Sequence, residues 1–223
     1  MLLAVETSGL SGSIALFSEG KVYREQSLGA DGPRHAQALV RETDVLLRNA
    51  GLTVRDLTSV AVSIGPGSFT GLRVGVVFAK TLAWLQGIPL VAVNSLQALA
   101  WQVPPSLERI TMISDAQRSE VFSLDCHWDT QKAEWLPVGE VCIREIGSLQ
   151  PERVVAGPVV DRHRPVLAAQ NPSQILLSLV PRATGVGQVG TRLLAEGAFS
   201  CAETLEPLYV RPSYAEEKRS GNR

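Results

Sequence analysis

Segments of strand and helix character follow one another in an order that few folds accommodate. Three strand-like runs come first, at 2–5, 13–17 and 21–26, and Glu19-Gly20 between the last two is a hairpin signal. Helix-like and strand-like segments then alternate, at 34–50 (helix), 60–64 (strand), 71–85 (helix), 89–93 (strand) and 95–101 (helix). Closely connected strands pair antiparallel, whereas strands joined through a helix pair parallel. We therefore expect a mixed sheet with helices on its faces.

The same order of elements begins again after a proline-rich stretch, Val103-Pro104-Pro105-Ser106. The later segments are strands at 110–114, 120–126, 135–143, 154–156 and 175–179, and a final helix at 186–197. This repetition predicts two α/β lobes, each a mixed sheet flanked by helices, over 1–104 and, smaller, over 105–215. A single α/β sheet with a β-rich extension is the alternative. Residues 216–223 are polar and are expected to form a frayed tail.

Composition places the chain among globular proteins and narrows its function. Hydrophobic residues make up 45% and charged residues 19%, which excludes a disordered chain or a coiled-coil rod. The net charge is −1, so we expect contact with nucleic acid only within a complex. None of the three cysteines belongs to a Cys-x-x-Cys pair, and no segment reaches the ~18 apolar residues of a membrane span. A cytoplasmic protein without membrane contact is predicted.

A glycine-rich loop, Gly65 to Thr70, joins the strand at 60–64 to the helix at 71–85. Glycine permits positive φ and close backbone approach, and Thr70 is a candidate helix cap. The exposed amides at the start of a helix can bind an anion. The spacing matches neither the Walker pattern nor the dinucleotide fingerprint, so an anion site and a purely structural turn both stay open.

The helix at 71–85 contains few strongly polar residues, namely Arg73, Lys80 and Thr81. A helix that is apolar nearly all round is buried on more than one side. Two rows recur every four residues: a small row of Gly71, Gly75, Ala79 and Ala83, and a bulky row of Val74, Phe78 and Leu82, with Leu85 beside it. One row can face the chain's own sheet and the other a partner polypeptide. We predict such a contact; the alternative is that the helix at 34–50 covers the second row.

The loop after the first strand carries the remaining candidate chemistry. Glu6, Thr7 and Ser8 supply a carboxylate, hydroxyls and amides, which can hold a phosphate and its metal. A tight polar turn is the alternative reading. The corresponding stretch in the second half, 115–120, has no glycine. Because the histidines lack metal-site spacing and no Gly-x-Ser-x-Gly elbow occurs, we predict no catalytic and no metal-ligating residue.

Three stretches together resemble the TsaB family, also called YeaZ. They are the first strand ending in Glu6-Thr7-Ser8, the run from Gly65 to Gly75 with Ala79-Lys80 beyond it, and Pro207-Leu208-Tyr209-Val210-Arg211. The resemblance implies two lobes of the actin/Hsp70/sugar-kinase (ribonuclease H-like) type. It also implies a place in the bacterial machinery that adds threonylcarbamoyl to N6 of adenosine 37 in tRNAs reading codons that begin with A. In that machinery TsaD is the transferase, TsaE the ATPase, and TsaC makes the donor.

The role implied by the resemblance is a non-catalytic scaffold. It would bind and activate a TsaD-like transferase, in a complex that includes a TsaE-like ATPase, and form a homodimer when alone. The implied interface helices carry the predicted partner residues His35, Leu39, Leu46, Gly71, Val74, Gly75, Phe78, Ala79 and Leu82. ATP and metal would belong to the assembled complex. No cofactor is expected on the isolated chain, since Glu6 replaces the usual aspartate.

Two enzymatic alternatives stay open. A metalloprotease-like hydrolase would need metal ligands or a nucleophile. A small-molecule kinase of the same superfamily would need a second phosphate-binding loop.

Overall fold

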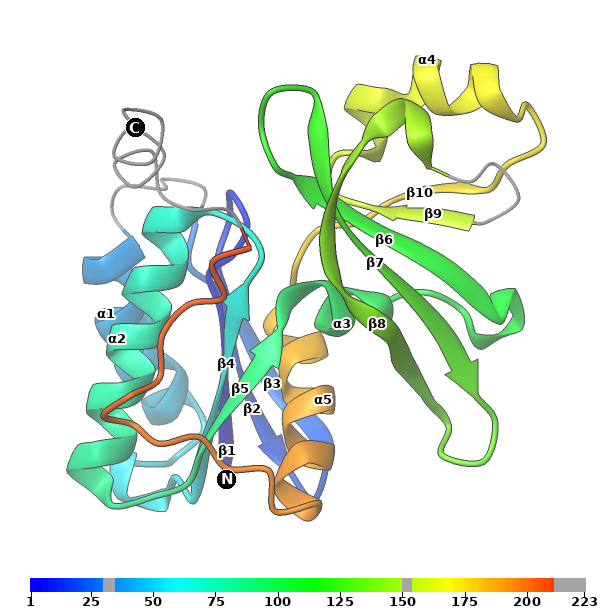
Figure 1. The fold of residues 1–223 in the computed structure, drawn as a ribbon. Helices are drawn as coiled ribbons and strands as arrows, with labels where there is room; N and C mark the ends of the chain where they lie inside the picture. The colour runs from blue at the N-terminus through cyan, green and yellow to red at the C-terminus, as the bar shows by residue number, and fades with distance from the viewer. Residues whose placement is uncertain (30–34, 150–153, 211–223) are drawn as a thin grey trace.

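The computed structural model describes residues 1–29, 35–149 and 154–210, with side chains from residue 38 onward in the second range, and contains two five-stranded sheets (Figure 1). The first sheet has the order β3-β2-β1-β4-β5. Its strands are β1 (Leu2–Glu6), β2 (Ser13–Ser18), β3 (Lys21–Ser27), β4 (Ser59–Gly65) and β5 (Leu90–Asn94). The first three strands pair antiparallel, whereas β1 with β4 and β4 with β5 pair parallel. The predicted mixed sheet is confirmed.

The second sheet repeats this plan. Its strands are β6 (Arg109–Asp115), β7 (Glu120–Asp129), β8 (Glu134–Glu145), β9 (Val154–Gly157) and β10 (Leu176–Ser178). The order β8-β7-β6-β9-β10 matches β3-β2-β1-β4-β5 strand for strand, with antiparallel pairs from β6 to β8 and parallel pairs from β6 to β10. Two similar mixed sheets, each flanked by helices, are therefore present as expected.

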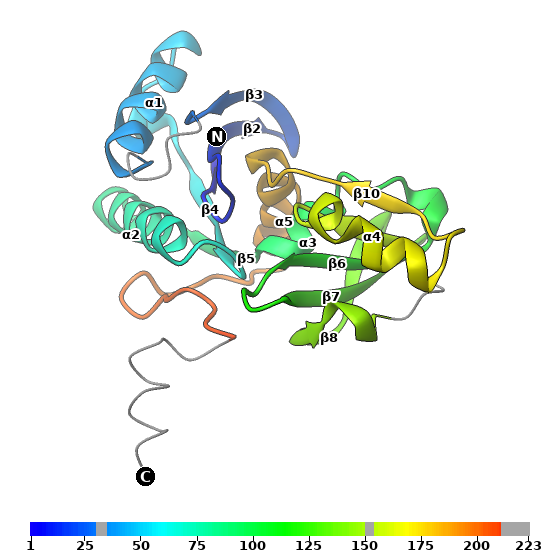
Figure 2. The same ribbon diagram turned by 90° about the horizontal axis from the view of Figure 1, so that it is seen from above.

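Helices cover both faces of the first sheet (Figures 1 and 2). On one face lie α1 (His35–Asn49) and α2 (Phe69–Gln86), which pack on the β-strand side chains of Leu3, Val5 and Ile14. On the other face lies α5 (Ala183–Ala195). Because successive strand residues point to opposite faces, β1 contributes Leu3 and Val5 to one core and Leu2 and Ala4 to the other.

The two halves exchange their last helices. The short helix α3 (Ser95–Ala100) follows the first sheet, yet Leu96 and Leu99 join the core of the second sheet with Met112 and Trp135. Conversely, α5 follows the second sheet and packs on the first. The approach of α5 is close, since a Cβ atom on Gly190 would lie 2.5 Å from the Ala61 side chain. The range 105–215 thus contains a helix whose packing partners lie within 1–104.

Some parts of the structure differ from the sequence expectation. The helix α4 (Val160–Gln170) was not predicted, because Pro165 interrupts it and only Val160 and Leu167 are buried. The described residues also contain three short 3-10 helices, η2 (Val54–Asp56), η3 (Pro105–Leu107) and η4 (Ile146–Ser148). The predicted first residue of the helix at 34–50 and the predicted tail at 216–223 lie outside the described residues.

Tryptophans fill the junction between the two halves. Trp128 of β7 makes edge-on contacts with Trp101 and Trp135, at ring-centre distances of 6.4 and 5.6 Å. The buried indole Nε1 of Trp135 donates a hydrogen bond to the carbonyl oxygen of Val103 at 3.1 Å. The proline-rich stretch that begins at Val103 is therefore bonded to the second core.

After α5 the chain returns along α2 and the edge of the first sheet (Figure 1). The amide of Ser200 donates to the carbonyl of Leu90 at 2.8 Å, which caps the open edge of β5. Lys80 Nζ donates to the carbonyl of Leu205 at 2.9 Å, and the amide of Leu208 donates to that of Ile64 at 2.7 Å. This returning segment, residues 200–209, is bonded to both α2 and β4.

Candidate functional site

The glycine-rich loop connects β4 to α2. The N-cap of α2 is Ser68, whose hydroxyl oxygen accepts a hydrogen bond from the amide of Gly71 at 3.3 Å. The sequence expectation of Thr70 as the cap was wrong, because the helix begins at Phe69, two residues earlier than expected. The helix ends at Gly87, whose φ of 63° is the left-handed conformation that glycine adopts readily.

Glycines at four-residue spacing let α2 approach the β1–β2 loop. A Cβ atom on Gly67 would lie 2.5 Å from the carbonyl oxygen of Ser8, and Cβ atoms on Gly71 and Gly75 would collide with the backbone and hydroxyl of Thr7. The amide of Ser68 also donates to the Ser8 carbonyl at 2.8 Å. The glycine spacing therefore serves a close contact within the chain.

This contact buries the loop that sequence reasoning selected for phosphate or metal. Glu6 and Thr7 are fully buried and Ser8 nearly so. The amide of Ser8 donates to Glu6 Oε1, while Glu6 Oε2 and Thr7 Oγ1 have no hydrogen-bond partner among the described residues. Burial raises the pKa of Glu6, and this effect outweighs the hydrogen bonds from Ser8 and Ser63. A fully buried carboxyl beneath α2 does not fit a nucleotide phosphate with its metal.

The structure places five of the predicted partner residues inside the chain's own core. These are Leu39, Leu46, Gly71, Gly75 and Ala79. As residues facing a partner they were wrong, because α1 and the small row of α2 are needed to cover the first sheet and the β1–β2 loop. Val74, Phe78 and Leu82 are half-buried against the same core, and the side chain of His35 lies outside the described residues.

A different row of α2 faces outward. Val77, Trp84 and Leu85 are 62%, 67% and 64% exposed, and Phe69 and Arg73 are exposed nearer the helix start. We call these five residues the outer α2 face. Phe69, Arg73, Val77 and Trp84 are four, four and seven residues apart, so they share one side of the helix. Sequence reasoning missed this row because Arg73 and Lys80 interrupt its apolar pattern.

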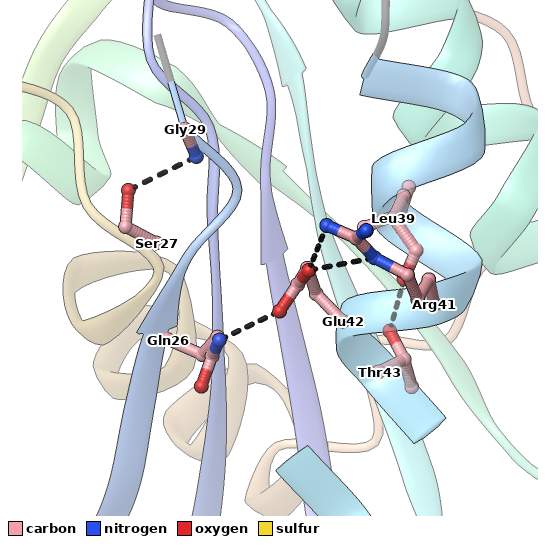
Figure 3. A network of polar contacts seen from close by, with 7 residues as sticks. All are labelled: Gln26, Ser27, Gly29, Leu39, Arg41, Glu42 and Thr43. Carbon is pink, nitrogen blue, oxygen red and sulfur yellow. Dashed lines mark hydrogen bonds and ion pairs between the residues drawn. The ribbon is translucent and has the colours of Figure 1, made fainter. Parts of the chain in front are cut away.

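The neighbouring helix α1 is anchored to the sheet by polar contacts (Figure 3). Gln26 of β3 donates from Nε2 to Glu42 Oε2 at 2.7 Å, and Arg41 donates to Glu42 Oε1 at 2.6 Å. On the other side of the helix, Thr43 donates its hydroxyl to the carbonyl of Leu39 at 2.7 Å. The Gln26–Glu42 hydrogen bond joins α1 to β3, and Val40 of α1 adds another exposed apolar side chain.

An arginine between two aromatic rings marks the start of the outer α2 face. The guanidinium carbon of Arg73 lies 3.8 Å from the centre of the Phe69 ring, within cation–π distance. Arg73 Nε donates a hydrogen bond to the Tyr209 hydroxyl at 3.1 Å. The two rings are themselves 5.6 Å apart. The returning segment thus holds Arg73 in one orientation.

No three His, Cys, Asp or Glu side chains within 1–29, 38–149 and 154–210 lie together in a way that suits a metal ion. The 115–120 stretch is a hairpin turn whose Asp115 pairs with Arg162 of α4 at 2.7 Å. Among all the described residues, none of the helices is long and apolar enough to cross a membrane.

Comparison with known proteins identifies relatives of this arrangement. The family model described as TsaD, tRNA N6-adenosine threonylcarbamoyltransferase, matches residues 32–149, more than half of the chain. The tRNA threonylcarbamoyladenosine biosynthesis protein TsaB of Bacillus subtilis is 37% identical over 122 residues, which cover 55% of this chain and about half of that protein (53%). TsaB of Escherichia coli is 26% identical over 99% of this chain and 98% of its own length.

The fold has a solved counterpart. A Pseudomonas aeruginosa protein described as similar to peptidase YeaZ superposes with a TM-score of 0.81 and 26% identity, covering 94% of this chain and 99% of that one. A second structure, YeaZ from the same organism, gives a TM-score of 0.79 and 25% identity over 93% and 98% of the two chains. The chain therefore belongs to the family described as TsaD, tRNA N6-adenosine threonylcarbamoyltransferase, and it is similar over nearly its whole length to TsaB and YeaZ proteins.

Proposed function

We propose that the chain acts in the biosynthesis of threonylcarbamoyladenosine at position 37 of tRNA, as a scaffold that binds and activates a TsaD-like transferase. The TsaB relatives of this chain carry the name of that pathway, and the transferase family model matches the chain. The single observation that carries the scaffold role is the outer α2 face. An exposed apolar helix face on an otherwise closed core is typical of a protein–protein contact.

The scaffold itself does no chemistry and binds no cofactor in this proposal. The support is the burial of Glu6 and Thr7 beneath the glycine row of α2. ATP and metal enter with the other subunits of the assembled complex, a TsaD-like transferase and a TsaE-like ATPase. Contact with tRNA is made by that complex, in the cytoplasm.

The docking surface combines the outer α2 face with the exposed side of α1. A stable interface buries about 800 Å² on each partner. When the transferase is absent, the same surface pairs two copies of this chain. Both pairings then compete for α2, so the homodimer is the resting form. No observation in the described residues favours the hydrolase or the kinase alternative.

Reconstitution tests the proposal. The modification of tRNA is assayed with TsaC, TsaD and TsaE, with the chain included, omitted, or replaced by Val77→Asp. We expect product with the unaltered chain, and none when the chain is omitted or replaced by Val77→Asp. The matched control is Val166→Asp, a comparably exposed valine on α4 that should support full activity. Equal rates of modification with and without the chain would contradict the scaffold role.

A further inference from the structure

We propose that Arg73 binds a carboxylate side chain of the transferase partner, and that this contact makes the outer α2 face prefer that partner over a second copy of the chain. The inference rests on the proposed function and adds the chemistry of the partner. In the sequence, Arg73 is only one of the two cationic residues of α2, with Lys80.

The guanidinium of Arg73 is held in place before any partner arrives. The Phe69 ring lies beneath it at 3.8 Å, and Tyr209 accepts the hydrogen bond from Nε at 3.1 Å. Both rings are about half exposed, so the cluster sits at the surface. An arginine that is already ordered loses little conformational entropy on binding. Aromatic and arginine side chains also carry much of the binding energy at protein interfaces.

The two remaining nitrogens of Arg73, Nη1 and Nη2, have no ion-pair or hydrogen-bond partner among the described residues. A partner that covers Val77 and Trp84 also removes water from Arg73, because all three lie on one side of the helix. Burying an unpaired charge is costly, so the covering surface must offer an anion. The planar fork of two N–H groups fits a carboxylate in bidentate geometry.

A second copy of the chain does not offer that anion from the same helix. The helix α2 carries Arg73 and Lys80 and no acidic residue. The amine of Lys80 is already bonded to the carbonyls of Glu203 and Leu205. On α1, Asp44 is paired with Arg48 at 2.6 Å, and Glu42 is engaged by Gln26 and Arg41. Contact of α2 with α2 therefore brings together cations only, which disfavours the homodimer.

Two dissociation constants test the proposal. Calorimetry measures the binding of the chain to the TsaD-like transferase of the same organism. Analytical ultracentrifugation measures the dissociation of the homodimer. For Arg73→Gln we expect transferase binding to weaken by about tenfold or more, with homodimer formation unchanged or tighter. Tyr209→Phe keeps the charge and removes its orienting hydrogen bond, so an intermediate loss is expected. Arg73→Lys should not restore full affinity, because an ammonium cannot form the bidentate contact.

The control is Arg164→Gln, an exposed arginine paired with Asp161 on α4, which should bind both partners like the unaltered chain. If Arg73→Gln binds the transferase normally while Val77→Asp does not, the carboxylate contact is wrong and the scaffold role stands. If neither variant affects binding, the docking face itself is wrong. Equal weakening of both pairings would refute the preference. Loss confined to tRNA binding by the complex would assign Arg73 to a phosphate instead.

Discussion

The guanidinium Nε of Arg192 lies 2.5 Å from Oε2 of Glu134, and this ion pair joins α5 on the first sheet to β8 of the second. The Glu134 side chain is almost fully buried, and that of Arg192 is 23% exposed. The pair is thus a polar bridge between the halves, beside the tryptophan cluster at their junction.

Removing one member of this bridge should destabilise the protein. Glu134→Ala leaves Arg192 partly buried without its closest counter-charge, although Glu196 still lies 2.8 Å from Nη1. We expect a loss of about 2–3 kcal/mol in the free energy of unfolding, between the values for exposed and fully buried pairs. Urea unfolding measures it. The control Asp161→Ala, which breaks an exposed pair on α4, should change the free energy by about 0.5 kcal/mol or less.

A methyl group on the glycine row should be costly. In Gly71→Ala the new Cβ atom meets the carbonyl oxygen of Thr7, so either α2 or the β1–β2 loop must move. We expect destabilisation by about 1–3 kcal/mol, despite the higher helix propensity of alanine. Thermal unfolding gives the result. Thr70→Ala, at the exposed neighbouring position, is the control and should leave the melting temperature nearly unchanged; an equal effect of both would contradict the close contact.

Glu6 should make stability depend on pH. Burial raises the pKa of Glu6 in the folded state above its value in the unfolded chain, so the unfolded chain releases the proton first. The contribution of Glu6 to stability is therefore fully present below the ordinary glutamate pKa of about 4.3 and is lost as the pH rises through the higher folded value. Glu6→Gln removes this decline. Urea midpoints at about pH 5 and about pH 8 should differ less in Glu6→Gln than in the unaltered chain; an unchanged difference would contradict the buried neutral acid.

A charge should have opposite consequences at two positions on α2. Val77→Asp adds a carboxylate to an exposed site, so the fold should persist while co-purification with the transferase is lost. Ala79→Asp places the same carboxylate in the fully buried core and should prevent folding. Circular dichroism and a pull-down together distinguish the two. Retained pairing in a folded Ala79→Asp protein would show that the small row faces outward after all.

The three cysteines should differ in reactivity. Burial raises the pKa of the Cys126 thiol to about 12, with the negative charge of Asp125 adding to the effect. Cys201 is exposed, and Cys142 is partly covered. We expect Cys201 to react first with iodoacetamide and Cys126 only after unfolding. Mass spectrometry of the modified peptides identifies the order, and early labelling of Cys126 would contradict its burial.

Local patterns made most of the fold predictable. The apolar run at β1, the hairpin at Glu19-Gly20 and the helical spacing of α1 each depend on a few neighbouring residues. Their order, repeated after Pro104, was enough to predict two similar mixed sheets. The helix α4 was not predicted, because Pro165 and the small number of buried side chains leave it without a periodic apolar pattern.

The packing partners of the helices could not be predicted in the same way. The spacing of Gly71, Gly75 and Ala79 shows that something approaches α2 closely, but the approaching group, Thr7, lies more than sixty positions earlier in the chain. The periodicity of α5 likewise shows a buried face without naming the sheet that covers it. For the same reason, the outward row of Val77 and Trp84 could be identified only after the structure showed which rows of α2 are buried.

The exchange of α3 and α5 has a consequence for synthesis on the ribosome. All five strands of the first sheet have been translated by Asn94, yet the helix that covers one of its faces ends at Ala195. A nascent chain therefore carries an uncovered apolar surface, formed by Leu2, Ala4, Phe17 and their neighbours, while about a hundred further residues are added. We expect chaperones that recognise hydrophobic segments to bind the chain during this interval, and a gene truncated after the first sheet to yield aggregates rather than a soluble domain.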